Sequence, residues 1–505
     1  MKSVLIAGAL AIAALSLSPG GAAAQSTLRV GLAEDPDVLD PTLARTYVGR
    51  IVFASICDKL FDIDAKLGIV PQLALSHETS ADGKTLTIKL RPGVTFHDGE
   101  PMDAAAVKYS LDRHRTMQGS FRRAELSVVE AVEAPDATTV VLKLKAPFAP
   151  LLATLTDRAG MIVSPKAAEA AGDKFGTAPV CAGPYRFVER VQQDRIVVEK
   201  FKEHWNASAY SFDRITYLPI VDGTVRLANL RSGQIDMLER LQASDVAEVK
   251  KDARVKFASL TGLGYTGLTI NVANGDRAKS NVLAKDKRIR QALELSIDRD
   301  AINQVVFNGE FNSGNQWVPP TNPWYVKSVP TPKRDIAKAK ELLKAAGVTN
   351  PSFTLMVPTG NEGQQVAQVI QSMAKEAGFD VKIQQVEFAT SLQTAQKGDF
   401  DAYQIGWSGR VDPDGNLTAF IACDGGQNDG KYCNQDVEAA LKLTRSTSNF
   451  EQRATAYETI AKAHADDVPR IYLYHPTWFW AMNPKLAGFQ PVPDGMIRLN
   501  GMKMN

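Results

Sequence analysis

The sequence predicts an α/β fold, and three observations support this prediction. Strand and helix patterns alternate from residue 353 to residue 406, which is typical of a parallel sheet with helices on its faces. Residues 61–160 instead contain several short alternating strands and one helix. With 505 residues, the chain is long enough for two or three domains with large cores.

Helix caps and terminal glycines bound the elements of the second half. Asp298 and Asp335 precede two of its helices, whereas Gly347 and Gly378 end two. We expect, in order, a helix at Arg299–Phe307, a helix after Asp335, a strand at Phe353–Val357, a helix at Gln364–Ala377, a strand at Val381–Val386, a helix near Ser391–Gln396, a strand at Asp401–Gly406 and a helix at 450–465.

The first half shows the same kinds of signal with less regular spacing. We expect a strand at Thr27–Leu32, helices at Arg45–Leu60 and Ala104–Arg115, and a helix after Asp222 that ends at Gly233. Residues 486–499 return to strand and turn character.

The first 24 residues have the three parts of a secretory signal peptide in the right order. Lys2 supplies the positive charge, Val4–Leu17 is apolar but short for a membrane span, and Ala22-Ala23-Ala24 matches a cleavage site. We expect the mature chain to start at Gln25. The cleavage region has no cysteine, and no later apolar run reaches the length of a span, so we expect a periplasmic protein without a membrane anchor.

The overall charge of the chain is close to neutral. The formal net charge is +2 at pH 7, and charged residues make up 23% of the chain. This balance gives no reason to expect nucleic acid as a partner.

Three segments carry a resemblance to a known family. Asp82-Gly83 opens an alternating strand, Pro92-Gly93 ends it and Asp98-Gly99 turns the chain again, which indicates a hairpin-like element. Gly183-Pro184-Tyr185 and the end of a helix at Gly233–Asp236 follow later. Together these segments resemble the peptide/nickel/oligopeptide-type (family 5) extracytoplasmic solute-binding proteins of ABC transporters, and the motifs are closest to the dipeptide-binding branch.

The resemblance implies a type II periplasmic-binding-protein fold with two lobes, an extra inserted subdomain and a ligand cleft between the lobes. The crossings between the lobes would lie near Leu268–Asn271 and Met482–Lys485. The implied boundaries are 1–24 for the signal peptide, 25–60, 162–268 and 486–505 for lobe I, 61–161 for its inserted subdomain and 269–485 for lobe II.

The segment Gly406–Asn416 is the first candidate for ligand binding because it follows the last expected parallel strand. Trp407 offers an apolar wall, and Ser408 and Arg410 offer hydrogen-bond donors. In the dipeptide-binding branch the position of Arg410 carries an aspartate that holds the peptide amine, which a guanidinium would repel. The substitution predicts a ligand whose anionic group faces Arg410.

Two other interpretations of this segment remain open. In one, Asp412 is the amine anchor of a conventional di- or oligopeptide receptor. In the other, Arg410 pairs with Asp412 or Asp414 and only shapes the loop.

Three further segments supply weaker candidates for the cleft. For each of them a purely structural role is equally consistent with the sequence, although aromatic walls with a few polar anchors are typical of small-molecule sites. The candidates are Arg45, Tyr47, Gly264, Tyr265, Gln316 and Trp317.

The four cysteines are compatible with disulfides in an exported protein. Cys423 and Cys433 bracket a loop rich in glycine, asparagine and aspartate, and we expect them to be bridged. Cys57 and Cys181 would then be partners by elimination, although two buried free thiols remain an alternative.

No motif argues for catalysis or for a cofactor. Gly425–Lys431 fits the start of a phosphate-binding loop, but Tyr432 stands where the magnesium-binding serine or threonine belongs. The histidines form no metal-ligand pair, so no metal is expected. We therefore expect a monomer that captures a small molecule and delivers it to ABC permease subunits in the inner membrane. A periplasmic enzyme or a chaperone on the same scaffold is the alternative from another class.

Overall fold

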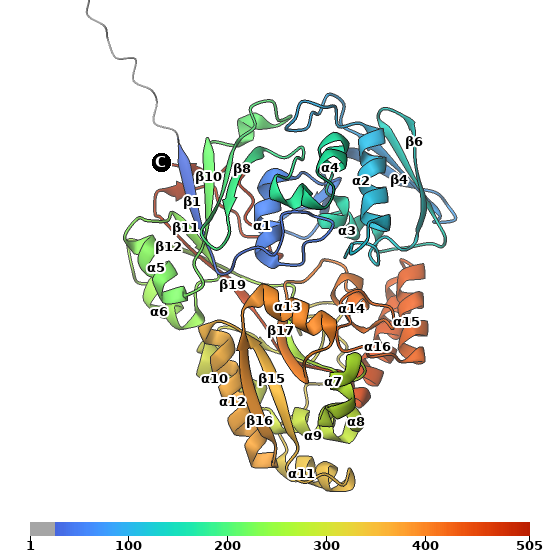
Figure 1. The fold of residues 1–505 in the computed structure, drawn as a ribbon, viewed down its shortest axis with the longest axis vertical. Coiled ribbons are helices and arrows are strands. Elements are labelled where there is room, and N and C mark those ends of the chain that lie inside the picture. Colours follow the sequence, from blue (N-terminus) through green and yellow to red (C-terminus); the bar gives the residue numbers. More distant parts are fainter. Residues whose placement is uncertain (1–25) are drawn as a thin grey trace, which may run out of the picture.

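The computed structural model describes residues 26–505, so the expected signal peptide at 1–24 lies outside the described residues. Two bodies lie one above the other along the longest axis (Figure 1). The upper body, lobe I, is built on a seven-stranded sheet, and the lower body, lobe II, is built on a six-stranded sheet. None of the helices within residues 26–505 has the length and apolar character needed to cross a membrane.

The sheet of lobe I has the strand order β12-β19-β11-β1-β10-β9-β8. Strand β1 lies parallel to β10 and β11, and the other pairs are antiparallel. Its strands are β1 (Thr27–Leu32), β8 (Tyr185–Val191), β9 (Arg195–Lys200), β10 (Arg214–Pro219), β11 (Met237–Glu239), β12 (Lys256–Thr261) and β19 (Thr477–Met482).

Helix α1 packs against this sheet and shares its hydrophobic core. The chain's end returns to the same core, where Met496, Ile497 and Leu499 are buried. The other elements of this lobe are α1 (Tyr47–Ile56), α4 (Pro165–Ala171), α5 (Gly223–Arg231), α6 (Val246–Val249), β20 (Leu486–Ala487) and β21 (Lys503–Met504).

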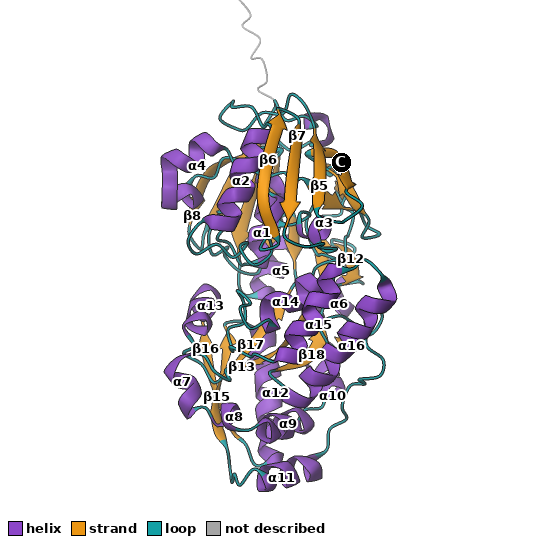
Figure 2. Cartoon of the chain, turned by 90° about the vertical axis from the view of Figure 1, so that its right-hand side faces the viewer, coloured by secondary structure: helices purple, strands orange, loops and turns teal. Residues whose placement is uncertain are grey.

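An inserted subdomain with its own core stands beside this sheet. It is an antiparallel sheet of order β4-β5-β7-β6, and Figure 2 shows β5, β6 and β7 next to helix α2. The expected element at Asp82-Gly83 is a hairpin turn between β4 and β5, and Gly83 has a φ of +68°. The elements are β2 (Phe61–Ile63), β3 (Ile69–Pro71), β4 (Ala74–Thr79), β5 (Thr85–Leu90), β6 (Val129–Asp136), β7 (Thr139–Leu144), α2 (Ala104–Thr116) and α3 (Leu151–Thr154).

The sheet of lobe II has the order β14-β18-β13-β17-β15-β16. Only β15, β16 and β17 are parallel, since β13 pairs antiparallel with both β17 and β18. The expected parallel arrangement therefore holds for the β-α-β-α-β segment but not for the whole sheet. The strands are β13 (Tyr265–Ile270), β14 (Asn312–Ser313), β15 (Ser352–Pro358), β16 (Asp380–Val386), β17 (Ala402–Trp407) and β18 (Arg470–His475).

The helices of lobe II begin and end as their caps predict. The side chains of Asp298 and Asp335 accept hydrogen bonds from the amides of Ala301 and Lys338. Gly378 has a φ of +104°, which favours glycine. The helices are α7 (Gly275–Ser280), α8 (Val282–Lys285), α9 (Lys287–Ser296), α10 (Arg299–Phe307), α11 (Ile336–Ala345), α12 (Asn361–Ala377), α13 (Phe388–Lys397), α14 (Asp414–Ile421), α15 (Gln435–Ser446) and α16 (Phe450–Asp467).

The chain passes from one sheet to the other at two places. Gly262–Gly264 connects β12 of the upper sheet to β13 of the lower sheet, and Pro476 connects β18 back to β19. Both crossings precede the expected ones near Leu268 and Met482, because β13 and β19 each lie wholly within one sheet. The exact domain boundaries remain a prediction.

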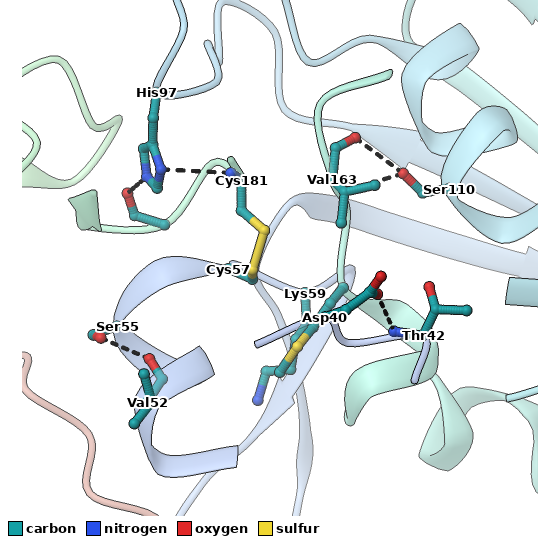
Figure 3. Close-up of a disulfide and its surroundings, with 12 residues drawn as sticks. Asp40, Thr42, Val52, Ser55, Cys57, Lys59, His97, Ser110, Val163 and Cys181 are labelled. Carbon is teal, nitrogen blue, oxygen red and sulfur yellow. Dashed lines mark hydrogen bonds between the residues drawn. A yellow bond between two sulfur atoms is a disulfide. The ribbon is translucent and has the colours of Figure 1, made fainter. Parts of the chain in front are cut away.

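Both expected disulfides are present. Cys57 pairs with Cys181 and Cys423 pairs with Cys433, and the described residues contain no free cysteine. Figure 3 shows the first bridge, which joins the end of α1 to the segment before β8 next to His97. His97 contacts the amide of Cys181 and the carbonyl of Gly183.

Candidate ligand-binding site

A cavity of about 240 Å³ lies at the boundary of the two sheets, next to the crossing at Pro476. Both lobes line it: Tyr47 and Arg240 come from lobe I, and Tyr265 and Trp407 come from lobe II. A neighbouring hollow of about 450 Å³ shares Arg240 and other lining residues with it. The cavity thus has the position and size of a small-molecule site.

Aromatic rings form much of the cavity wall. The rings of Tyr47 and Trp478 stack with their centroids 4.6 Å apart, and the Tyr47 hydroxyl donates to the carbonyl of Gly495. On the other lobe Trp407 lies edge-on to Phe420 at 4.8 Å. Hydrogen bonds and ring contacts hold these rings in place, so they form apolar surfaces of fixed shape.

Six charged side chains also line the cavity, and four of them pair with an opposite charge. Arg45 lies 3.3 Å from Asp429, and Arg240 lies 3.2 Å from Glu34 and 2.7 Å from the buried Glu239. Arg240 has a φ of +50°, an uncommon conformation for a residue other than glycine. The six are Glu34, Arg45, Arg240, Glu362, Asp429 and Arg470.

The remaining two, Arg470 and Glu362, have opposite charge and form no close ion pair in the described part of the chain. Within residues 26–505, no carboxylate lies within 4 Å of the guanidinium nitrogens of Arg470. Its Nη1 donates to the hydroxyl of Tyr265 at 2.9 Å, and the residue is 5% exposed. Among the same residues, no basic side chain lies within 4 Å of the Glu362 carboxylate, which accepts from the amide of Ala243 at 3.0 Å.

Burial affects the titration of the cavity carboxylates. Desolvation raises the pKa of Glu362, and it raises the pKa of Asp429 and Glu34 despite the nearby arginines. An ammonium group next to Glu362 would favour its charged form. A solute with an ammonium and a carboxylate of its own would supply an opposite charge to both Glu362 and Arg470.

Five residues expected at the cleft line this cavity: Arg45, Tyr47, Tyr265, Trp407 and Ser408. Gly264 packs behind the wall instead, because a Cβ on it would meet the carbonyl oxygen of Trp407 at 1.8 Å. Its small size lets β13 approach the loop after β17.

Gln316 and Trp317 do not line the cavity, and each is 1% exposed. The Gln316 amide donates to the carbonyl oxygens of Val326 and Val329. The Trp317 ring packs 5.9 Å from that of Tyr457. Both side chains stabilise a loop within lobe II, the structural role that the sequence left open for them.

Arg410 and Asp412 also lie outside this cavity and line a smaller one of about 100 Å³. Arg410 forms an ion pair with Asp157 and stacks 4.2 Å above Trp407, whereas Asp412 pairs with Arg453 at 2.6 Å. Arg410 therefore pairs with neither Asp412 nor Asp414. Although burial opposes it, Arg410 and then Arg50 hold the pKa of Asp157 well below its usual range.

Three charged residues of the cavity were not predicted from the sequence. Arg470 is the first residue of β18, and Glu362 is the second residue of α12. Arg240 directly follows β11. The one signal for Arg470 is a charge at the head of the apolar run Ile471–Leu473. Only the way in which the two sheets meet brings these residues together.

Comparison with known proteins identifies the family. The middle-region model of the bacterial extracellular solute-binding proteins, family 5, matches residues 68–428. The chain belongs to this family. Its role is accordingly that of the substrate-binding component of an ABC transporter.

Named relatives agree with the family over almost the whole chain. The glutathione-binding protein GsiB of Pectobacterium atrosepticum is 30% identical over 498 residues, which are 96% of this chain and 95% of the relative. The dipeptide-binding protein of Escherichia coli is 27% identical over 469 residues, 86% of each chain.

A solved structure supports the two-lobed fold. The structure of the binding protein AgaA from A. tumefaciens R10, in complex with agropinic acid, matches with a TM-score of 0.87 and 27% identity. The match covers 95% of this chain and 99% of that one. The expected type II periplasmic-binding-protein fold is confirmed, and the relatives are binding proteins rather than enzymes.

Proposed function

We propose that this family 5 protein captures a small solute that carries both an anionic and a cationic group. The observation that supports this most is that two opposite charges in the cavity, Arg470 and Glu362, form no close ion pair within residues 26–505. A buried charge is costly without a partner, and a solute with the complementary charges supplies both partners. The solute's carboxylate would bind Arg470, and its ammonium would bind Glu362.

This proposal keeps the anionic group expected from the sequence and moves its anchor from Arg410 to Arg470. Arg410 already has Asp157 as its counter-ion, so it has less to gain from a ligand anion. Asp412 is paired with Arg453 in the same way, which makes it a poor amine anchor. Trp407, Ser408, Arg45, Tyr47 and Tyr265 would supply the remaining contacts.

Short peptides and amino-acid conjugates both fit this charge pattern. The named relatives concern glutathione, a dipeptide and agropinic acid, and each of these solutes has a carboxylate. The argument from Arg410 against a peptide amine loses its force, because Arg410 does not line the main cavity. Peptides are therefore candidates on the same footing as other zwitterions.

The proposal also covers the export of the protein, its location and its transport partners. The leader at residues 1–24 would be removed before Gln25, and the mature protein would act in the periplasm as a monomer without an anchor. It would perform no chemistry and would hand its solute to separate permease and ATPase chains.

A thermal-shift screen tests the proposal. The panel contains dipeptides and glutathione, which carry both charges. It also contains agropinic acid, the amides, the N-acetyl forms and the doubly blocked forms of the dipeptides, and nickel–histidine chelates. A solute at 100 times its Kd stabilises the protein by about 2.7 kcal/mol, which gives a clear shift. We expect the largest shifts from solutes that carry both charges. A larger shift from a doubly blocked peptide or a nickel chelate would overturn the proposal.

A further inference from the structure

The loop after β17 contacts lobe I through a group of charged side chains. Arg410 of this loop forms an ion pair with Asp157, which lies between α3 and the short helix Arg158–Gly160 of the inserted subdomain. Nε of Arg50, on α1, donates to the same carboxylate at 2.9 Å, and its Nη1 donates to the hydroxyl of Ser408 at 3.0 Å. Side chains of both lobes thus meet at one carboxylate.

This contact is buried from solvent. The Asp157 and Arg50 side chains are each 6% exposed, and that of Arg410 is 12% exposed. Interactions between such charges are screened far less by salt and water than those on a surface. The net interaction of these buried charges therefore has a larger effect on the energy difference between open and closed lobes than an ion pair on the surface would have.

Positive charges outnumber negative charges in this cluster. Arg158 lies 3.9 Å from Asp157. Arg122 pairs with Glu125 at 2.8 Å and acts electrostatically on both Asp157 and Arg158. The cluster thus contains the four guanidinium groups Arg50, Arg122, Arg158 and Arg410 against two carboxylates. Asp157 is the carboxylate that lies between the cation of lobe II and the cations of lobe I.

We propose that Asp157 is the counter-ion that holds the two lobes together in their closed arrangement. With its charge present, Arg410 of lobe II and Arg50 of lobe I share one carboxylate. With its charge removed, the same two guanidinium groups face each other across the lobe boundary and repel. Asp157 thereby shifts the balance between open and closed lobes toward closure, together with other contacts between the lobes such as that of Arg45 with Asp429. This role does not depend on which solute the cavity takes.

The proposal predicts an order of effects that a simple loss of one contact would not produce. Arg410→Gln removes an attraction but leaves Asp157 paired with Arg50, so the lobes open partly. Asp157→Asn removes the attraction and adds repulsion, so the lobes open further. The double variant Asp157→Asn/Arg410→Gln removes the repulsion again and lies between the wild type and Asp157→Asn.

Pulsed electron spin resonance between one label on each lobe measures this order. Glu130 of β6 and Lys442 of α15 are exposed and belong to the parts of the two lobes that face each other in Figure 1, so both are changed to cysteine and labelled. The protein is first unfolded with its disulfides intact and refolded to remove any solute. Small-angle scattering of the unlabelled variants gives a second measure of opening.

Ion pairs within a single lobe provide the controls. Arg29→Gln breaks the pair with Asp236 in lobe I, and Arg277→Gln breaks the pair with Asp401 in lobe II. Neither control is expected to change the distance between the labels. Circular dichroism and the Tm establish that each variant is folded.

We expect the population ratio of closed to open lobes to be about tenfold lower in Asp157→Asn than in the wild type. An unchanged distance in Asp157→Asn, or an opening in Arg410→Gln that equals or exceeds it, overturns the proposal. If Asp157→Asn fails to fold, Asp157→Ser tests the same claim. It also removes the carboxylate charge between Arg410 and Arg50 and must lengthen the distance.

Discussion

Arg470 donates from Nη1 to the hydroxyl oxygen of Tyr265 at 2.9 Å, and both residues line the cavity between the lobes. The Tyr265 hydroxyl in turn donates to the carbonyl oxygen of Asn416 at 3.2 Å. This chain of hydrogen bonds fixes the guanidinium in the wall without using a carboxylate. Its positive charge remains available to a solute.

Replacing Arg470 is therefore expected to remove most of the affinity for an anionic solute. Arg470→Gln removes the charge that a ligand carboxylate would pair with, at a cost of about 3 kcal/mol, or roughly a hundredfold in Kd. Calorimetric titration with the best solute of the panel measures this. Arg410→Gln is the matched control and is expected to change Kd by less than about tenfold. Equal losses in the two variants would show that Arg470 has no special role.

Tyr265→Phe is expected to have a smaller effect of the same kind. It removes the hydroxyl that orients Arg470 but keeps the ring, and a hydrogen bond to a charged group contributes about 1.5 kcal/mol. Affinity is expected to fall roughly tenfold. The affinity for a solute whose carboxylate is amidated is not expected to change. A loss of the same size for the amide would mean that the hydroxyl acts on something other than the anion.

Glu362→Gln tests the other end of the proposed charge pair. The carboxylate is the expected partner of the solute's ammonium, so its loss weakens binding of the free amine by about tenfold. Binding of the N-acetylated solute should not change. Titrations of both solutes to both proteins give the coupling between the two groups. A coupling energy of zero would show that Glu362 does not interact with the ammonium group of the solute.

The two disulfides are expected to contribute unequally to stability. Cys423 and Cys433 are 10 residues apart in sequence, whereas Cys57 and Cys181 are 124 apart. In the chain-entropy estimate the shorter loop contributes about 3 kcal/mol and the longer one about 5 kcal/mol. Guanidinium unfolding of the two double serine variants measures the difference. A larger loss in the Cys423/Cys433 variant would contradict this order.

The buried His114 is expected to lower the stability of the folded protein in mild acid. It is fully buried, its Nε2 donates to the carbonyl oxygen of Met161, and its Nδ1 accepts from Thr42. Burial lowers its pKa from 6.5 to about 4. The unfolded chain therefore takes up a proton at a higher pH than the folded protein. The contribution is fully present above pH 6.5, and about 3 kcal/mol of it is lost as the pH falls to about 4.

His114→Gln removes this part of the pH dependence. Glutamine can accept from Thr42 and donate to Met161 without titrating. Urea unfolding on both sides of the window compares the two proteins. A slope with pH that is the same in the variant and in the wild type would contradict the assignment to His114.

Local signals in the sequence were enough to predict most elements of the fold. Asp298 and Asp335 cap the helices that they were expected to cap, and Gly378 ends a third. The sheet crossings were placed too late in the chain. No local pattern marks the point at which one strand ends in one sheet and the next begins in another, since β12 and β13 are separated only by Gly262–Gly264.

The site was harder to predict, for a reason that Arg410 illustrates. The sequence places it in the loop after a strand, where ligands bind in open α/β sheets. Its actual partner, Asp157, comes from a segment far away in the sequence. Arg470 is the opposite case. Nothing near it in the sequence indicates that no carboxylate within residues 26–505 pairs with it. Charge pairing across lobes is a property of the tertiary structure alone.

The most direct test of the central claim is a calorimetric titration of the purified protein with a zwitterionic solute and with its amide. The proposal predicts that the free acid binds and that the amide binds at least about tenfold more weakly, because only the acid can pair with Arg470. Equal Kd values for the acid and the amide would show that the cavity does not select an anionic group.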